Sequence, residues 1–177
     1  MLTSNQKITP NLWFDDQAEE AARYYVSIFK DSEILAISRY GAGTPKPEGS
    51  VLTVAFTLEG QSFTALNGGP QFAFSEAISF IVHCSTQEEV DHYWERLSEG
   101  GDAKAQMCGW LKDRYGVSWQ VVPDALIEYI TDPDPVKVQR TMQAMLQMKK
   151  LDIAALKRAH DGTDAASTAT ERPEGGG

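Results

Sequence analysis

The sequence predicts an α+β fold built from two successive modules, each with the element order strand, helix, strand, strand, strand. Short segments of alternating apolar and polar residues, separated by Gly-, Pro- and Asn-rich turns, indicate the strands. A segment with helical spacing of apolar residues follows the first strand of each set. Three consecutive strands joined by short turns pair antiparallel, so this order excludes a doubly wound parallel sheet and the usual nucleotide-binding architectures.

The first module is assigned to residues 1–70. A strand is expected at residues 8–14, and an amphipathic helix then runs from Asp16, with Glu19 as its capping-box partner, to about Lys30. Further strands are expected at residues 33–40, 50–59 and 61–66, with Gly60 in the last turn. The glycines at 41–43 and 68–70 do not lead from a strand into a helix, so they predict turns and not a phosphate-binding loop.

The second module, residues 71–123, repeats this order. A strand is expected at residues 77–84, and a helix capped by Thr86 with Glu89 ends at the glycine pair 100–101. A strand at residues 103–111 leads into an antiparallel hairpin, in which residues 107–111 and 117–122 flank a charged turn at 112–116. The two modules share no obvious residue identity, so the repeat is one of architecture.

The hairpin segment CGWLKDRYGVSWQVVP, residues 108–123, contains the residue that fits its strand least well. Alternation places Ser118, Gln120 and Val122 on one face and Trp119 and Val121 on the other. Gln120 is an amide in the middle of an apolar strand. It is either a core amide with a backbone partner or a residue that contacts a ligand, and the sequence leaves both readings open.

Residues 124–162 form a predicted helical extension. A short helix is expected at 124–130, the Asp- and Pro-rich break at 132–135 starts the next helix, and that helix extends from Val136 to about His160. Its methionines predict a docking surface that covers the body of the protein or a partner subunit. Residues 163–177 contain almost no large apolar side chain, which predicts a disordered tail.

Charge and cysteine content limit the partners and the compartment. The net charge is -9 and the pI about 4.8, so nucleic acid and anionic membranes are not expected partners. Cys84 and Cys108 both fall in apolar strand-like segments, which favours buried, reduced thiols; a buried disulfide is the alternative. The sequence shows no signal peptide and no membrane span, so a cytoplasmic location is expected.

Several segments resemble one known family. These are ITPNLWF, AEEAARYYVSIF, LNGGP, EAISFIVHC, CGWLKDRYGVSWQVVP and AMLQMKKLDIAALKRA, which together reach from residue 8 to about His160. They resemble the PhnB-like branch of the vicinal-oxygen-chelate superfamily, the glyoxalase/bleomycin-resistance fold. The resemblance implies partial barrels, paired modules that enclose a cleft, and a homodimer. Members of this branch often carry the label demethylubiquinone methyltransferase, and their biochemical function is otherwise poorly defined.

The resemblance also implies where metal-dependent relatives hold a divalent cation. Those positions fall on Thr9 or Asn11, on Asn67, on Ser79 and on Gln120. None is His, Asp, Glu or Cys, and neutral amides and hydroxyls do not offset the lost hydration of the ion, so no metal and no other cofactor is expected. His83 shares the face of Ser79 and would be the residue to restore a metal site; the alternative is a hydrogen-bonded wall residue. His92 and His160 are expected at the surface.

Without a metal, the polar positions become hydrogen-bonding groups in an aromatic enclosure. The predicted ligand-binding residues are Thr9, Asn11, Trp13, Asn67, Ser79, His83, Trp110 and Gln120. Such a lining suits a small planar or carbonyl-bearing molecule. The alternative is that the tryptophans only fill the core.

The sequence leaves the choice between a binding protein and an enzyme open. A metal-free small-molecule-binding protein is the preferred interpretation, because no catalytic constellation is visible. The alternative is a glyoxalase-type lyase or isomerase, or the methyltransferase of the family label, although the sequence shows no glycine-rich strand-to-helix turn to bind S-adenosylmethionine. Acid or base chemistry would fall on Glu76 or Asp113. The alternative is that both are solvated caps, which is the usual role of a single acidic residue in a turn.

Overall fold

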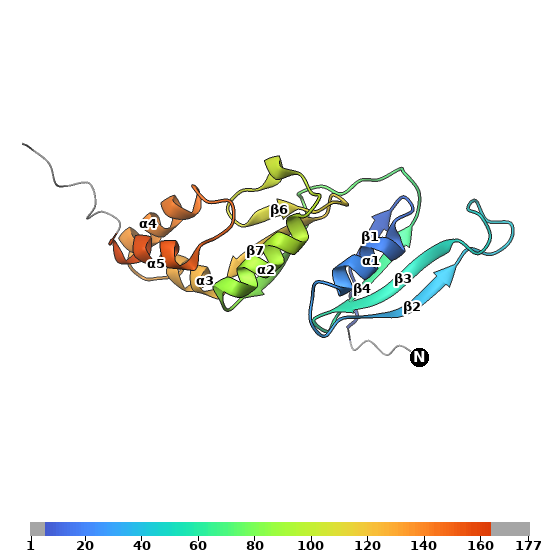
Figure 1. The fold of residues 1–177 in the computed structure, drawn as a ribbon, viewed down its shortest axis with the longest axis horizontal. Coiled ribbons are helices and arrows are strands. Elements are labelled where there is room, and N and C mark those ends of the chain that lie inside the picture. The colour runs from blue at the N-terminus through green and yellow to red at the C-terminus, as the bar shows by residue number, and fades with distance from the viewer. Residues whose placement is uncertain (1–5, 164–177) are drawn as a thin grey trace, which may run out of the picture. The chain divides into compact units, whose positions relative to one another are not determined.

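The computed structural model describes residues 6–163 of the chain. It forms two compact units, the first comprising residues up to 77 together with 115–117, and the second comprising 78–114 together with 118 onward. Each unit contains one small sheet with a helix packed against it, and three further helices belong to the second unit (Figure 1). The predicted α+β class is therefore confirmed.

The first unit contains a four-stranded sheet in the order β1-β4-β3-β2. Its elements are β1 (Asn11–Phe14), α1 (Ala18–Val26), β2 (Glu33–Arg39), β3 (Val51–Leu58) and β4 (Gln61–Asn67). The three consecutive strands β2, β3 and β4 pair antiparallel, as predicted, and β1 pairs parallel with β4. Alternate residues of β1, β3 and β4 are buried together with the inner face of α1, so the helix covers one face of the sheet.

The start of α1 differs from the prediction. The helix begins at Ala18, and neither Asp16 nor Gln17 caps it with a side chain. Instead, the Ala18 N–H donates to Asn67 Oδ1 at 2.8 Å, and Asn67 Nδ2 donates to the Val51 carbonyl at 3.1 Å. The helix cap thus comes from a strand distant in sequence, which a local capping motif does not reveal.

Trp13 and the Gly68–Gly69 pair form a second contact at this end of the sheet. The Trp13 Nε1–H donates to the Gly69 carbonyl at 2.8 Å, and the Gly68 N–H donates to the Phe14 carbonyl at 2.9 Å. The indole lies so close over Gly68 that a Cβ at this position would be 2.2 Å from the ring. Residue 68 must therefore be glycine if Trp13 is to keep its place.

The second unit contains a three-stranded sheet in the order β5-β7-β6. Its elements are β5 (Ser79–Cys84), α2 (Gln87–Ser98), β6 (Trp110–Lys112) and β7 (Ser118–Pro123). β5 pairs parallel with β7, and β6 pairs antiparallel with it, so the first and last strands of each set are parallel neighbours. The predicted cap of α2 is confirmed, since Thr86 accepts a hydrogen bond from the Glu89 N–H at 3.3 Å.

The strand predicted at residues 103–111 is mostly absent. Residues Ala103–Ala105 form a 3-10 turn in which Asp102 accepts from the Lys104 N–H, and the extended segment is confined to β6. Cys108 and Gly109 both have positive φ, at 53° and 83°, and Met107 pairs with Trp110 across them. Two successive residues with positive φ make a tight reversal, so the chain turns here instead of continuing as a strand.

The C-terminal extension consists of three helices, α3 (Asp124–Ile130), α4 (Pro135–Met145) and α5 (Ile153–Asp161). The break before α4 is as predicted, with Asp134 accepting from the Val136 N–H and Pro135 at the first helical position. The single long helix predicted from Val136 is wrong, because it is interrupted between α4 and α5. Met145 and Met148 pack against a buried cluster of Leu126, Leu151 and Leu156 and so face the extension's own core, whereas Met142 is exposed.

Main-chain hydrogen bonds explain the interruption. The N–H groups of Cys108 and Gly109 donate to the carbonyls of Met148 and Lys149, each at 2.8 Å. Carbonyls that accept bonds from the Cys108–Gly109 turn are unavailable to a continuing helix. Asp152 then starts α5 by accepting from the Ala155 N–H at 2.8 Å.

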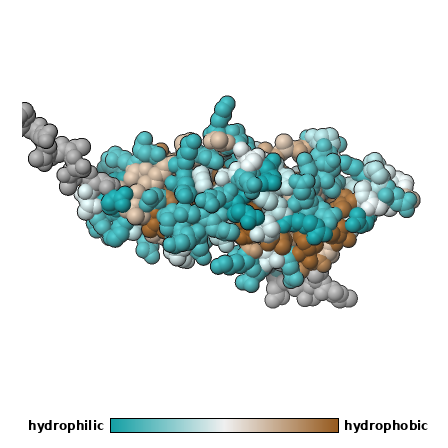
Figure 2. All heavy atoms as spheres, in the orientation of Figure 1, coloured by the Kyte–Doolittle hydropathy of each residue, from teal (hydrophilic) through white to brown (hydrophobic). Residues whose placement is uncertain are grey.

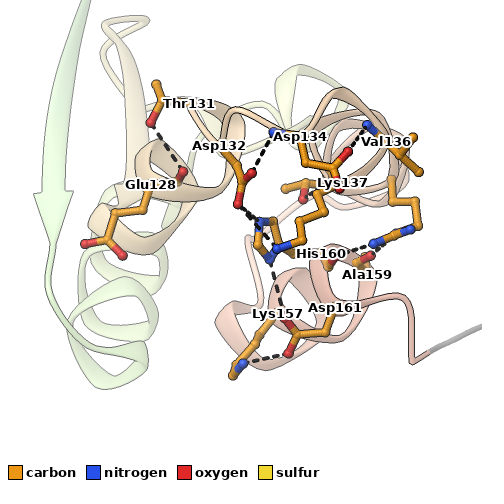
Figure 3. A network of polar contacts seen from close by, with 12 residues as sticks. Glu128, Thr131, Asp132, Asp134, Val136, Lys137, Lys157, Ala159, His160 and Asp161 are labelled. Atoms are coloured by element: carbon orange, nitrogen blue, oxygen red, sulfur yellow. Dashed lines mark hydrogen bonds and ion pairs between the residues drawn. The ribbon is translucent and has the colours of Figure 1, made fainter.

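His160, predicted at the surface, is buried, with 8% of the residue exposed. Its ring stacks on Tyr129 with centroids 4.6 Å apart. Figure 3 shows the contact of its Nε2 with Asp132 Oδ2, which is 3.1 Å away. Its Nδ1 lies 3.4 Å from Asp161 Oδ1. The prediction failed because Tyr129 belongs to α3 and Asp132 to the turn after it, and the periodicity of α5 shows neither contact.

Hydrophilic residues cover most of the face seen in Figure 2. Within residues 6–163, no helix is long and apolar enough to cross a membrane.

Replacement of Gly68 by alanine tests the contact with Trp13. Gly68→Ala is expected to lower the free energy of unfolding by about 2 kcal/mol or more, because the added methyl displaces the indole and its bond to Gly69. Gly41→Ala is the matched control, since a Cβ there would meet no atom within 4 Å. Urea denaturation of both variants measures the difference, and equal stability of the two would contradict the proposed role of Gly68.

Replacement of Asp132 tests the network around His160. The Asp134 N–H, and after it Lys137 and His160, hold the pKa of Asp132 below its ordinary value. A lowered folded-state pKa gives stability that is present above the unfolded pKa of about 3.9 and is lost as pH falls through the folded pKa. We therefore expect Asp132→Asn to be less stable than the natural chain at pH 7, with the two stabilities converging in acid.

Thermal unfolding between pH 3 and pH 7 provides this measurement. A difference between the two proteins that stays constant over the whole range would show that the charge of Asp132 plays no part.

Candidate functional site

The face of the second sheet opposite α2 carries most of the predicted site residues. In β7, Trp119 and Val121 are buried on the side of Leu111 and the apolar stripe of α2. Gln120 and Val122 are less buried and share the opposite face, as the alternation predicts. We call this the open face of the second sheet.

Ser79, Trp110 and Gln120 lie together on this open face. Gln120 Nε2 donates to Ser79 Oγ at 2.9 Å, and Trp110 is the register partner of Gln120. None of the residues 6–163 donates to Gln120 Oε1, and the Ser79 hydroxyl donates to none of them. The alternative of a Gln120 amide held by the backbone of the core is therefore wrong, because its partner is a side chain on the same face.

His83 lies further along the same face of β5, as predicted, and is exposed. Its Nδ1 is 3.8 Å from Asp124 Oδ1, and the Ser85 hydroxyl donates to Asp124 Oδ2 at 3.1 Å. At this distance no hydrogen bond forms between the two side chains, so Asp124 does not fix the imidazole. A histidine in this arrangement can donate or accept one hydrogen bond with a bound molecule.

Ser118 is a residue of this face that the sequence reasoning did not select as a site residue. It is the register partner of Ser79 on β5 and of Lys112 on β6, and only 2% of it is exposed. Its Oγ is the buried side-chain polar atom that has no hydrogen-bond partner among the described residues. The sequence signal that could have identified Ser118 is its position two residues before Gln120 in the same strand, because alternation places both side chains on one face.

Asp113 occupies a different environment from the one predicted. It is 2% exposed, and its Oδ2 accepts a hydrogen bond from Trp119 Nε1–H at 2.9 Å. The expectation of a solvated turn carboxylate is wrong, because Asp113 folds inward to satisfy the buried indole of Trp119. Glu76, the other acid considered for proton transfer, is exposed.

The two cysteines are free and differ in exposure. Cys84 is buried in β5, and burial, followed by the charges of Glu89 and Asp124, raises its pKa to about 12. A thiol with so high a pKa is a poor nucleophile at neutral pH. Cys108 is partly exposed and lies in a turn, so its predicted place within a buried strand is wrong.

In the first sheet, the predicted residues separate onto two faces. Trp13 and its register partner Leu66 share the face opposite α1, and Asn11 with Thr64 lie on the same face. Asn67 lies on the other face of the sheet and is buried under α1, where its amide caps the helix. Thr9 precedes β1 and is exposed.

Asn67 was selected as the ligand-facing residue of β4, but the residue there that faces away from α1 is its neighbour Leu66. The capping role of Asn67 left no trace in the local sequence.

The donor sets of both faces do not fit a divalent cation. Ser79 and Gln120 are neutral, His83 adds a single imidazole to the open face, and the residues that face away from α1 on β4 include Thr64 and Leu66. Divalent metals in proteins are held by carboxylate, thiolate or imidazole ligands. Among residues 6–163, no group of three or more His, Cys, Asp or Glu side chains is placed to hold a metal ion.

Comparisons with known proteins agree with this architecture. The model of the family described as 3-demethylubiquinone-9 3-methyltransferase matches residues 6–122. A PhnB protein from Bacillus cereus, whose name carries the same methyltransferase description, is 41% identical, with a TM-score of 0.61, over 67% of this chain and 99% of that one. No protein of curated function matches the chain.

Two more distant structures share the fold. Protein PA1353 from Pseudomonas aeruginosa is 21% identical with a TM-score of 0.55, over 67% of this chain and 97% of its own. The fosfomycin resistance protein FosX from Mesorhizobium loti is 15% identical with a TM-score of 0.51, over 73% and 100% of the two chains. The family match over residues 6–122 and the close similarity to the Bacillus cereus protein show that this chain belongs to the 3-demethylubiquinone-9 3-methyltransferase family, the PhnB-like branch of the glyoxalase/bleomycin-resistance superfamily.

Proposed function

We propose that the chain is a metal-free binding protein for a small molecule, which contacts the open face of the second sheet. The observation that carries the proposal is the Gln120–Ser79 hydrogen bond of 2.9 Å, which fixes a polar pair on a face that also bears Trp110. The pair offers an acceptor at Gln120 Oε1 and a donor at the Ser79 hydroxyl. An aromatic surface beside a fixed donor and acceptor suits a planar, carbonyl-bearing ligand.

His83 extends this set along the same face of β5. Thr9, Asn11 and Trp13 remain proposed ligand contacts of the first sheet, although the indole N–H of Trp13 already bonds Gly69. Asn67 is the weakest member of the predicted set, because both ends of its amide are engaged within the first unit.

Benzamide and acetophenone are suitable probes of this site, since both are planar and carry a carbonyl group. We expect either to shift the NMR signals of the Gln120 side-chain amide and the Trp110 indole, and we expect Gln120→Leu to weaken binding about tenfold by removing the acceptor and the Ser79 partner. Gln147→Leu, an exposed glutamine of the α4–α5 linker, is the matched control. Binding that neither probe shows, or that Gln120→Leu leaves unchanged, would refute the proposal.

The proposed absence of a bound metal is tested by measuring how much metal the protein retains. After incubation with Zn²⁺, Ni²⁺ or Mn²⁺ and exhaustive dialysis, the protein is expected to retain far less than one equivalent per chain, because the site offers neutral donors. One equivalent of metal held through dialysis would contradict this expectation.

The second candidate is an enzyme, and the methyltransferase description of the matching family favours it. A glyoxalase-type lyase or isomerase is the other form of this candidate. Against a methyltransferase, the strand-to-helix turns in the described part of the chain, at residues 15–17 and 85–86, contain no glycine. Calorimetry with S-adenosylmethionine separates the two, since micromolar binding would establish the methyltransferase and replace the binding function.

We also propose that the protein is a cytoplasmic homodimer without nucleic acid or membrane partners. The family likeness and the net charge of -9 support this assignment. Light scattering coupled to size exclusion measures the oligomeric state directly.

A further inference from the structure

We infer that one side of α4 is an interface between two copies of this chain, related by a two-fold axis. We call it the outer face of α4, and its residues are Val138, Gln139, Met142, Gln143 and Leu146. The inference rests on the homodimer proposed above and names the surface that forms it. The family match ends at residue 122, so the argument for this surface comes from the C-terminal helices themselves.

α4 uses only one of its sides to pack within the chain. Thr141 is buried, and Met145 packs against the buried leucine cluster of the extension. On the outer face, 44% of Met142 and 56% of Leu146 are exposed, and Val138 lies one helical turn before Met142. A helix with apolar residues on two sides is incompletely covered by one contact, so the outer face remains available to a partner.

The outer face borders a groove of about 450 Å³. Pro133 and Pro135 of the break before α4 also line this groove, together with Asp132. Exposed apolar surface that continues into a groove is typical of a protein–protein contact, and methionine is enriched in such contacts.

The charges beside the groove are engaged within the extension, which suits a contact between identical surfaces. Asp132 Oδ2 lies 3.1 Å from His160 Nε2 and 3.7 Å from Lys137 Nζ (Figure 3). Arg140, the other charged residue of α4, donates to the carbonyls of Ala159 and His160. A two-fold contact places a patch against its own copy, so unpaired charge of one sign would repel. Because the chain carries a net charge of -9, a neutral face is the favourable one for self-association.

Gln139 and Gln143 provide the polar groups of the outer face. They are four residues apart and exposed, and neither amide has a hydrogen-bond partner within residues 6–163. Each amide carries both donors and an acceptor, so it can pair with the same amide of another molecule. A second copy therefore supplies the matching polar pattern together with the matching apolar residues, which favours it over an unrelated partner.

The size of the face sets the expected affinity. α4 has 11 residues. A helix of this length spans about 16 Å. A contact limited to such a helix and the adjoining turn falls at or below about 1,200 Å² of buried surface, which is the range of weak and transient complexes. We therefore expect a dimer that dissociates at micromolar concentration.

Light scattering of the full chain between about 1 μM and about 300 μM tests the interface. The molar mass is expected to rise from that of one chain to that of two. Met142→Glu and Leu146→Glu are each expected to raise the dissociation constant at least about tenfold, because each brings a carboxylate into an apolar contact. Ile8→Glu is the matched control, since Ile8 is an 86% exposed apolar residue of the first unit, and it should dimerise like the natural chain.

A mixing experiment separates a lost interface from a lost fold. One variant carries Gln139→Glu and Gln143→Glu, and the other carries Gln139→Lys and Gln143→Lys. Each alone is expected to remain monomeric, because a two-fold contact would bring like charges together. An equimolar mixture of the two is expected to recover the dimer mass, which misfolded chains would not do. A mixture that stays monomeric would overturn the inference.

The outcomes distinguish this inference from the proposals on which it depends. A natural chain that stays monomeric up to about 300 μM overturns both the interface and the homodimer. A dimer that Met142→Glu and Leu146→Glu leave intact overturns the interface alone. Binding of benzamide or acetophenone to the second sheet is measured independently, and its failure would refute the ligand site without bearing on α4.

Discussion

The first unit depends on the hydrogen bonds of Asn67. Its side-chain amide accepts from the first N–H of α1 and donates to the Val51 carbonyl next to it in the sheet, while its own carbonyl accepts from the Tyr40 hydroxyl at 2.5 Å. One buried residue therefore joins the helix, β3, β4 and the end of β2. Because the helix N-terminus cannot be buried with its donors unpaired, this amide decides where α1 starts and how it lies on the sheet.

In the second unit, the N-terminus of the helix is capped by a residue that is near it in sequence. Thr86 caps α2 locally, and the buried pair of Asp113 and Trp119 occupies the region between the hairpin and the helix. The second sheet has three strands and the first has four, but in both the first and last strands of the set are parallel neighbours. The repeat is thus conserved in backbone topology between the two halves while the side chains that stabilise each half differ, which fits their lack of residue identity.

Features set by local sequence could be predicted, and features set by distant partners could not. The antiparallel hairpin, the faces of β7 and the Thr86 cap follow from alternation and from spacings of a few residues. The cap of α1 by Asn67, the buried position of His160 and the interruption before α5 each depend on a residue far away in sequence. For the site, the alternation of side chains along the strands placed Ser79 and Gln120 on one face. The lack of a hydrogen-bond partner for the Ser118 hydroxyl among the described residues is visible only in the structure.

The Cys108–Gly109 turn attaches the C-terminal helices through two main-chain bonds to residues 148 and 149. Neither bond involves a side chain, so each needs only a peptide carbonyl, and the side chain of Met148 packs instead against the core of the extension. The steric demand falls on position 109, where a Cβ would lie 2.9 Å from the Val121 carbonyl and 3.0 Å from Leu151. The absence of a side chain at position 109 is therefore what lets this turn lie against both β7 and the C-terminal extension.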